Sequence, residues 1–124
     1  MNSSDLRIGN WVAYNNDFFI IKTISKYRVT ATRGRGDVEF DYTSIKPIEL
    51  TEEILLKCGF EQELIKHQYS LRLITLQLPN ENDYHKKGRV YYNSWAIKNE
   101  CVEYLHQLQN LYFSLTNEEL NVQL

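Results

Sequence analysis

Residues 37–42 alternate between acidic and apolar side chains, and this pattern constrains the fold more than any other in the chain. The acidic positions are Asp37, Glu39 and Asp41, and the apolar positions are Val38, Phe40 and Tyr42. Successive side chains of a β-strand point to opposite faces of a sheet. The segment therefore predicts a strand that buries one face and exposes the other to water.

Three further strand-like runs precede this segment, at residues 11–14, 18–21 and 27–32. A turn-forming Asn-Asn-Asp sequence follows the first run. The third run leads into Arg33-Gly34-Arg35-Gly36, whose glycines can adopt the positive φ angles of a hairpin tip. Short strands at this close spacing predict a small curled antiparallel sheet or an SH3-like barrel over residues 1–48.

A short helix is predicted within residues 50–59. Thr51 can accept a hydrogen bond from the first free backbone N–H groups, and Gly59 suits the left-handed conformation that ends many helices. Glu52 and Glu53 follow the cap, where carboxylates complement the positive end of the helix dipole. Adjacent helical positions point in different directions, so these two residues are not interpreted as a catalytic carboxylate pair.

The C-terminal part contains alternating runs at residues 69–73 and 74–78 that are out of phase by one residue. A β-bulge near Leu73 and Ile74 would reconcile the two runs. A polar, charged segment then leads to Arg89-Val90-Tyr91-Tyr92. This arrangement predicts a C-terminal β-hairpin with a long tip.

An amphipathic helix is predicted near the end of the chain. Its apolar stripe at helical spacing consists of Cys101, Leu105, Leu108, Tyr112 and Leu115. Two starting points are open, because Asn99 could cap the helix or a strand could continue to Glu103 before the helix begins. Thr116 and Asn117 predict the helix end, since asparagine tolerates the left-handed conformation.

Together these elements predict an α+β fold. The chain has 124 residues, 43% of them hydrophobic, which fits a single domain with a β-rich part at residues 1–48 and an α+β part at residues 49–124. A domain of this size needs no disulfide or metal to fold, so Cys58 and Cys101 are expected as buried, reduced thiols. The chain shows no secretory signal and no run of 18 apolar residues, and we expect a cytoplasmic protein with no membrane partner.

The sequence contains none of the motifs that usually carry catalysis. The histidines, His67, His85 and His106, have no second ligand at metal-site spacing. No phosphate-binding glycine loop and no catalytic serine motif occurs. We therefore expect neither an enzyme nor a cofactor. The formal net charge of -2 also argues against nucleic acid or an anionic membrane as the dominant partner.

Two local clusters are the candidate binding sites. The first surrounds the glycine-containing tip and consists of Lys26, Tyr27, Arg28, Arg33 and Arg35. The second consists of Lys86, Lys87 and Arg89. Such a basic hairpin could follow a phosphate backbone while its aromatic ring stacks on a base. Basic residues also protect exposed edge strands from pairing, and the acidic residues at positions 37–41 would neutralise part of the first cluster.

Three segments carry a resemblance to known sequences: residues 6–12, 45–60 and 104–120. They resemble a family of short uncharacterised proteins from phages, prophages and mobile elements of Bacteroidetes. The most distinctive part is the Leu-His-Gln-Leu-Gln-Asn-Leu-Tyr-Phe run at residues 105–113, and Asn117 stands where that family often has glycine. The resemblance implies a phage or mobile-element setting in a bacterial host, and it transfers no functional residue.

These observations lead to two functional hypotheses. The first is a non-enzymatic accessory protein that binds a host or phage protein and acts on host or defence machinery in the bacterial cytoplasm. The alternative is a small nucleic-acid-binding module that uses the basic hairpin at residues 26–35. Self-association through the last helix is also left open.

Overall fold

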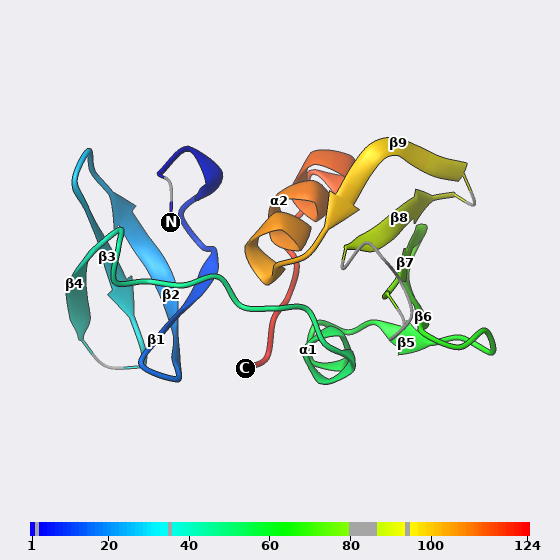
Figure 1. Ribbon diagram of the computed structural model, residues 1–124, viewed down its shortest axis with the longest axis horizontal. Helices are drawn as coiled ribbons and strands as arrows, with labels where there is room; N and C mark the ends of the chain where they lie inside the picture. The colour runs from blue at the N-terminus through cyan, green and yellow to red at the C-terminus, as the bar shows by residue number, and fades with distance from the viewer. Residues whose placement is uncertain (2, 35, 80–86, 94) are drawn as a thin grey trace. The chain divides into compact units, whose positions relative to one another are not determined.

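The computed structural model describes residues 1, 3–34, 36–79, 87–93 and 95–124. Within these residues the chain combines two antiparallel sheets with two α-helices, so the predicted α+β fold class is confirmed (Figure 1). None of the helices in this part of the chain is long and apolar enough to cross a membrane.

The chain divides into two compact units. The first unit consists of Met1–Glu49 and Tyr104–Glu119, and the second consists of Leu50–Glu103 and Leu120–Leu124. The division at Glu49 lies next to the boundary expected from the sequence. The last helix, however, belongs with the N-terminal strands, and not with the C-terminal part to which the sequence assigned it. That the whole chain is one domain stays a prediction.

The sheet of the first unit is an antiparallel meander with the order β1-β2-β3-β4. Its strands are β1 (Trp11–Tyr14), β2 (Asp17–Ile24), β3 (Arg28–Thr32) and β4 (Asp37–Asp41), and a short 3-10 helix, η1 (Ser3–Asp5), precedes them. Asn15 and Asn16, with φ angles of 50° and 67°, form the two-residue turn between β1 and β2. Positive φ at both positions fits the twist of a tight hairpin, which confirms the turn expected there.

This sheet is curled but is not closed into a barrel. The rings of Tyr14 on β1 and Phe40 on β4 lie 4.7 Å apart, so side chains from the two edge strands meet. The strands β1 and β4 do not pair, however, and Ala13 forms an isolated antiparallel bridge with Lys46 instead. Of the two predicted alternatives, the curled sheet is therefore the one observed.

The core of the first unit consists of side chains that the strands turn inward and of two residues outside the strands, Leu6 and Ile45. The buried residues are Leu6, Val12, Phe19, Ile21, Val29, Ala31, Phe40 and Ile45. The alternation in β4 is only partly reflected in burial. Phe40 is buried as predicted, but Val38 is 46% exposed, and Tyr42 lies beyond the strand and is half-buried. Val38 is close to the end of the strand, where the core no longer covers it.

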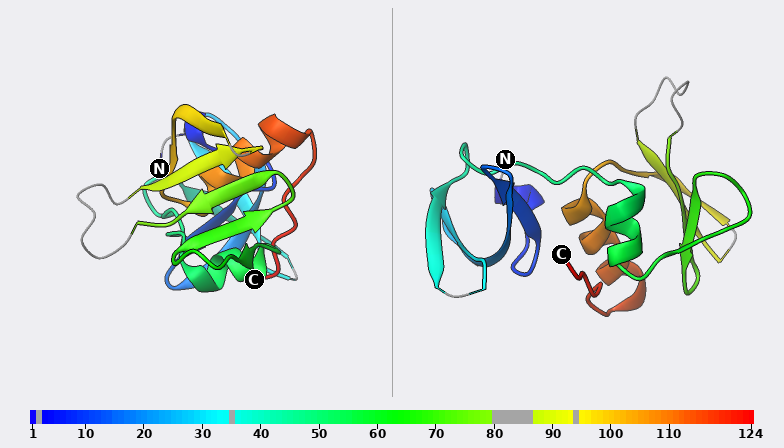
Figure 2. Two further views of the ribbon diagram at one scale, coloured as in Figure 1. Left: turned by 90° about the vertical axis from the view of Figure 1, so that its right-hand side faces the viewer. Right: turned by 90° about the horizontal axis from the view of Figure 1, so that it is seen from below.

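The second unit contains a short helix and a five-stranded antiparallel meander with the order β5-β6-β7-β8-β9 (Figure 2). The elements are α1 (Glu52–Lys57), β5 (Glu61–Gln62), β6 (Gln68–Leu71), β7 (Ile74–Gln77), β8 (Gly88–Tyr92) and β9 (Trp95–Val102). Thr51 Oγ1 accepts a hydrogen bond from the Ile54 N–H at 3.2 Å, and Gly59 has a φ angle of 88°. Both ends of α1 are thus formed as predicted.

A tight turn, and not a β-bulge, separates β6 from β7. Arg72 has a φ angle of 54°, and Leu71 pairs directly with Ile74. A two-residue turn shifts the alternation by one position just as a bulge would, so the sequence pattern alone did not distinguish them. The predicted hairpin of β7 and β8 is confirmed by the pairing of Leu76 with Val90, while its tip at residues 80–86 lies outside the described residues.

The strand β9 continues to Val102, and α2 spans Leu105–Thr116. The strand alternative for this segment is therefore correct. Cys101 lies in the strand and is exposed, so its assignment to the helical stripe and to a buried position was wrong. The predicted helix end is confirmed, because Asn117 adopts the left-handed conformation with a φ angle of 58°.

Candidate functional site

The structure separates the residues of the first basic cluster. Lys26 and Tyr27 lie between β2 and β3, Arg28 begins β3, and Arg33 follows its last residue. An extended strand rises about 3.3 Å per residue, so five residues of β3 place the two groups roughly 13–17 Å apart. The cluster expected around the glycine tip is therefore two groups at opposite ends of one strand. Arg35 lies outside the described residues.

Arg28 and Arg33 are both engaged by carboxylates of the same sheet. Arg28 lies 3.3 Å from a carboxylate oxygen of Glu39 and 3.2 Å from one of Asp41, and Arg33 lies 3.0 Å from Asp17. All these side chains are largely exposed, so the ion pairs add little to stability. The paired carboxylates do, however, compensate the positive charges of Arg28 and Arg33.

Lys26 and Tyr27 form the most open part of the predicted cluster. The Lys26 ammonium lies 5.4 Å from the centre of the Tyr27 ring, which is within the range of a cation–π contact. Tyr27 is 74% exposed. This pair has the chemistry expected of a contact surface, but it offers one positive charge and one ring.

The second basic cluster belongs to the other unit. Lys87 is exposed just before β8, and Arg89 is exposed on that strand, where its Cα faces those of Gln77 and Cys101. Lys86 lies outside the described residues.

An aromatic group lines the inner face of the curled sheet. Phe40 lies 4.7 Å from Tyr14 and 5.2 Å from Phe19, measured between ring centres. Phe19 and Phe40 are buried, whereas Tyr14 is 41% exposed. Val38 lies two residues from Phe40 on the same face of β4. Tyr14, through its ring contact, and Val38, through strand alternation, are therefore exposed apolar side chains that border Phe40.

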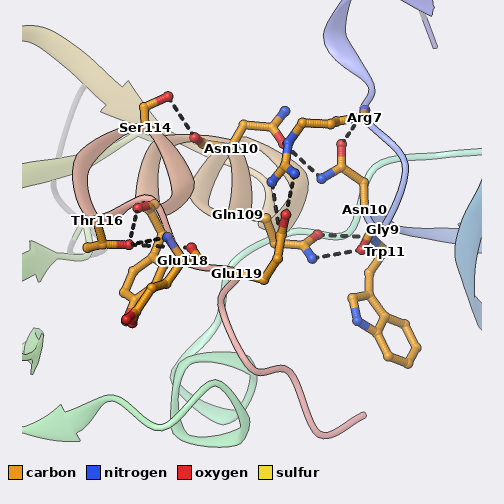
Figure 3. Close-up of polar contacts among 11 residues, drawn as sticks. Arg7, Gly9, Asn10, Trp11, Gln109, Asn110, Ser114, Thr116, Glu118 and Glu119 are labelled. Atoms are coloured by element: carbon orange, nitrogen blue, oxygen red, sulfur yellow. Dashed lines mark hydrogen bonds and ion pairs between the residues drawn. The ribbon is translucent and has the colours of Figure 1, made fainter.

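Sequence reasoning missed a polar network that connects the segment before β1 to α2 (Figure 3). The amide of Gln109 donates to the Gly9 carbonyl at 3.0 Å and accepts from the Trp11 N–H at 2.9 Å. Gln109 is 2% exposed. These two backbone groups are two residues apart, so one side-chain amide satisfies both a carbonyl and an N–H of the main chain.

Two asparagines and an arginine extend this network. Asn10 is fully buried, accepts from the Arg7 N–H at 2.7 Å, and donates to Asn110 Oδ1 at 2.8 Å. Arg7 Nε donates to the same oxygen at 3.1 Å. The Arg7 guanidinium also pairs with Glu119 and lies 4.5 Å from the centre of the Phe113 ring. Hydrogen bonding to Arg7 lowers the pKa of Glu119.

The network connects residues 6–12 with residues 104–120. Its donors and acceptors bond one another, so its role in this structure is to hold the two segments together. One signal in the sequence was available. Gln109 lies four residues after Leu105 and three before Tyr112, which places a polar amide within an apolar stripe.

Two further groups in the interior, His106 and Cys58, have shifted pKa values. His106 is buried against Tyr104, with ring centres 6.0 Å apart, and its Nδ1 has no hydrogen-bond partner. Burial lowers the pKa of His106, although Asp5 opposes the shift. Burial raises the pKa of the Cys58 thiol to about 12. No group of three histidine, cysteine or acidic side chains in this part of the chain could hold a metal ion.

Comparisons of the chain with protein-family models, with curated proteins and with solved structures found no match.

Proposed function

We propose that the protein is a non-enzymatic protein-binding module of a phage or mobile element, which acts on host or defence machinery in the bacterial cytoplasm. The observation that carries this proposal is the pairing of Arg28 and Arg33 with carboxylates of their own sheet. A carboxylate beside a guanidinium repels an approaching phosphate, so the local field no longer favours a nucleic-acid backbone.

Exposed apolar side chains support the same proposal. Leu64 is fully exposed and Ile65 is 59% exposed in the connection between β5 and β6, and Tyr27 is exposed in the first unit. Apolar and aromatic side chains occupy the centres of protein–protein interfaces, where they contribute most of the binding free energy. Both units thus carry side chains that a partner protein could cover.

The proposal is tested by affinity purification of the tagged protein from a bacterial host lysate, with and without nuclease. We expect a partner protein that is recovered equally under both conditions. Two variants tell which unit contacts the partner. The double variant Leu64→Ser with Ile65→Ser tests the second unit, and Tyr27→Ser tests the first; the one that reduces recovery of the partner identifies the unit. Loss of all recovered material on nuclease treatment contradicts the proposal.

The nucleic-acid alternative makes an opposite prediction that the same preparation can test. Binding to a labelled single strand should weaken steeply with salt, and Arg33→Glu with Arg35→Glu should abolish it. The matched control is Lys22→Glu with Lys46→Glu, which changes the net charge equally at two exposed positions of the same unit. Equal binding by the two double variants excludes the basic hairpin as the nucleic-acid site.

A further inference from the structure

The two edge strands of the first sheet differ in what covers them. Ala13 on β1 exchanges two backbone hydrogen bonds with Lys46, each of 2.8 Å, so that edge is partly occupied. Within the described residues, β4 pairs with β3 alone, and four of its five residues are exposed. Figure 1 shows β4 as the last strand of the meander. One backbone edge of β4 is therefore open to another strand.

The solvent-facing side of β4 is acidic. Asp37, Glu39 and Asp41 project from it, and the only opposing charge on the same face of the neighbouring strand is Arg28. Arg28 is shared between Glu39 and Asp41, whereas Asp37 forms no ion pair with any residue that the structure describes. Three carboxylates and one guanidinium leave a net charge of -2 on this face.

This charge pattern indicates which kind of strand could pair with β4. A second copy of the chain would bring its own β4 carboxylates opposite these, and like charges directly opposite in a sheet destabilise the pairing. A strand with lysine or arginine at every second position would instead meet complementary charges. Its intervening side chains would lie on the other face, where Val38 is exposed and the exposed Tyr14 contacts Phe40.

We propose that the open edge of β4 binds an extended segment of a partner protein, in which basic and apolar residues alternate, as a fifth strand of the sheet. Main-chain hydrogen bonds to β4 supply the affinity of such a contact, and the alternating side chains supply its specificity. The inference rests on the proposed protein-binding function and assigns to it a surface and a chemical class of partner.

The test uses the full-length protein and a synthetic peptide of alternating lysine and valine with blocked ends. We expect the peptide to shift the amide resonances of residues 37–41 in nuclear magnetic resonance spectra. We also expect the affinity to fall at least about tenfold when alternate peptide nitrogens are methylated, because each methyl group removes a main-chain donor. The variant Asp37→Lys should weaken binding severalfold, since it places a positive charge opposite the peptide's lysines.

The matched control is Glu61→Lys, which reverses an exposed carboxylate on β5, the edge strand of the other sheet. Equal weakening by both variants, resonance changes away from β4, or no change at about 1 mM peptide overturns the inference. Self-association of the protein that Asp37→Lys alters would identify a second copy as the occupant and also overturn it. The lysate purification tests protein binding separately, so a partner captured in undiminished amount by Asp37→Lys refutes this surface without refuting the proposed function.

Discussion

The guanidinium of Arg7 forms a bidentate ion pair with the carboxylate of Glu119, which lies 112 residues further along the chain. The same side chain contacts the Phe113 ring and Asn110. Arg7, which precedes β1, thus connects the start of the first unit to the end of that unit. The ion pair is partly exposed, so its own contribution is only about 0–1 kcal/mol. The buried amides beside it are expected to contribute more.

Replacing Gln109 by alanine should strongly destabilise the first unit. The substitution leaves the part-buried Gly9 carbonyl and Trp11 N–H without this partner. Two unsatisfied backbone groups are expected to cost about 2–4 kcal/mol of the free energy of unfolding. Urea denaturation followed by circular dichroism measures this loss. The control is Gln107→Ala, an exposed position of the same helix whose side chain accepts a hydrogen bond from the Tyr104 N–H at 3.1 Å, and for which a loss of about 1 kcal/mol is expected. Equal losses would contradict a structural role for the network.

The ion pair of Arg7 and Glu119 should make stability depend on pH in the acidic range. Hydrogen bonding to Arg7 lowers the pKa of Glu119 below its usual value of 4.5. A carboxyl with a lowered pKa in the folded state stabilises the fold above the unfolded-state pKa, and it loses that contribution as the pH falls through the folded-state value. The difference in unfolding free energy between the unmodified protein and Glu119→Gln should therefore vanish on acidification.

This acid dependence can be attributed to the pair by a double-mutant cycle with Arg7→Gln. The coupling free energy should be present near neutral pH, decrease with added salt, and disappear in acid. A coupling that is constant with pH would show that Glu119 acts through contacts other than its charge.

Protonation of His106 should destabilise the fold. Burial lowers its pKa from the usual 6.5, and Asp5 offsets part of this effect. The unfolded chain then binds the proton more readily than the folded chain, so stability falls as the pH drops below 6.5 and keeps falling until the folded-state pKa is reached. Between about pH 8 and about pH 5, the urea midpoint should fall more for the unmodified protein than for His106→Phe. Parallel pH profiles would refute this assignment.

Local signals in the sequence were sufficient to predict where helices and turns form, but not which elements pack together in one unit. The cap at Thr51, the turn at Asn15 and Asn16, and the left-handed Asn117 each depend on nearby residues, and all were predicted correctly. The assignment of α2 to the N-terminal strands depends on contacts between residues about 100 positions apart. No local pattern encodes which strands such a helix will join.

The candidate binding site at the basic hairpin shows the same limit of prediction from local sequence. Residues 26–33 are close in sequence, and this suggested one basic cluster, but an extended strand carries its two ends apart. The carboxylates that neutralise Arg28 were visible as an alternating pattern, and the sequence correctly indicated partial neutralisation. That Arg33 would instead pair with Asp17 depended on the register of β2 with β3, in which Thr32 faces Ile20 and Arg33 continues toward the start of β2.

The two cysteines should differ sharply in reactivity, although the sequence predicted a buried, reduced thiol for both. Cys101 is exposed on β9, whereas Cys58 is buried and its pKa is raised to about 12, so its reactive thiolate is scarcely populated. Titration with a thiol reagent at neutral pH should modify Cys101 rapidly in the folded protein. Cys58 should react only when denaturant exposes it, at a rate set by unfolding of its unit. The variants Cys101→Ser and Cys58→Ser assign the two phases, and rapid labelling of Cys58 in the folded Cys101→Ser variant would show that α1 opens readily without denaturant.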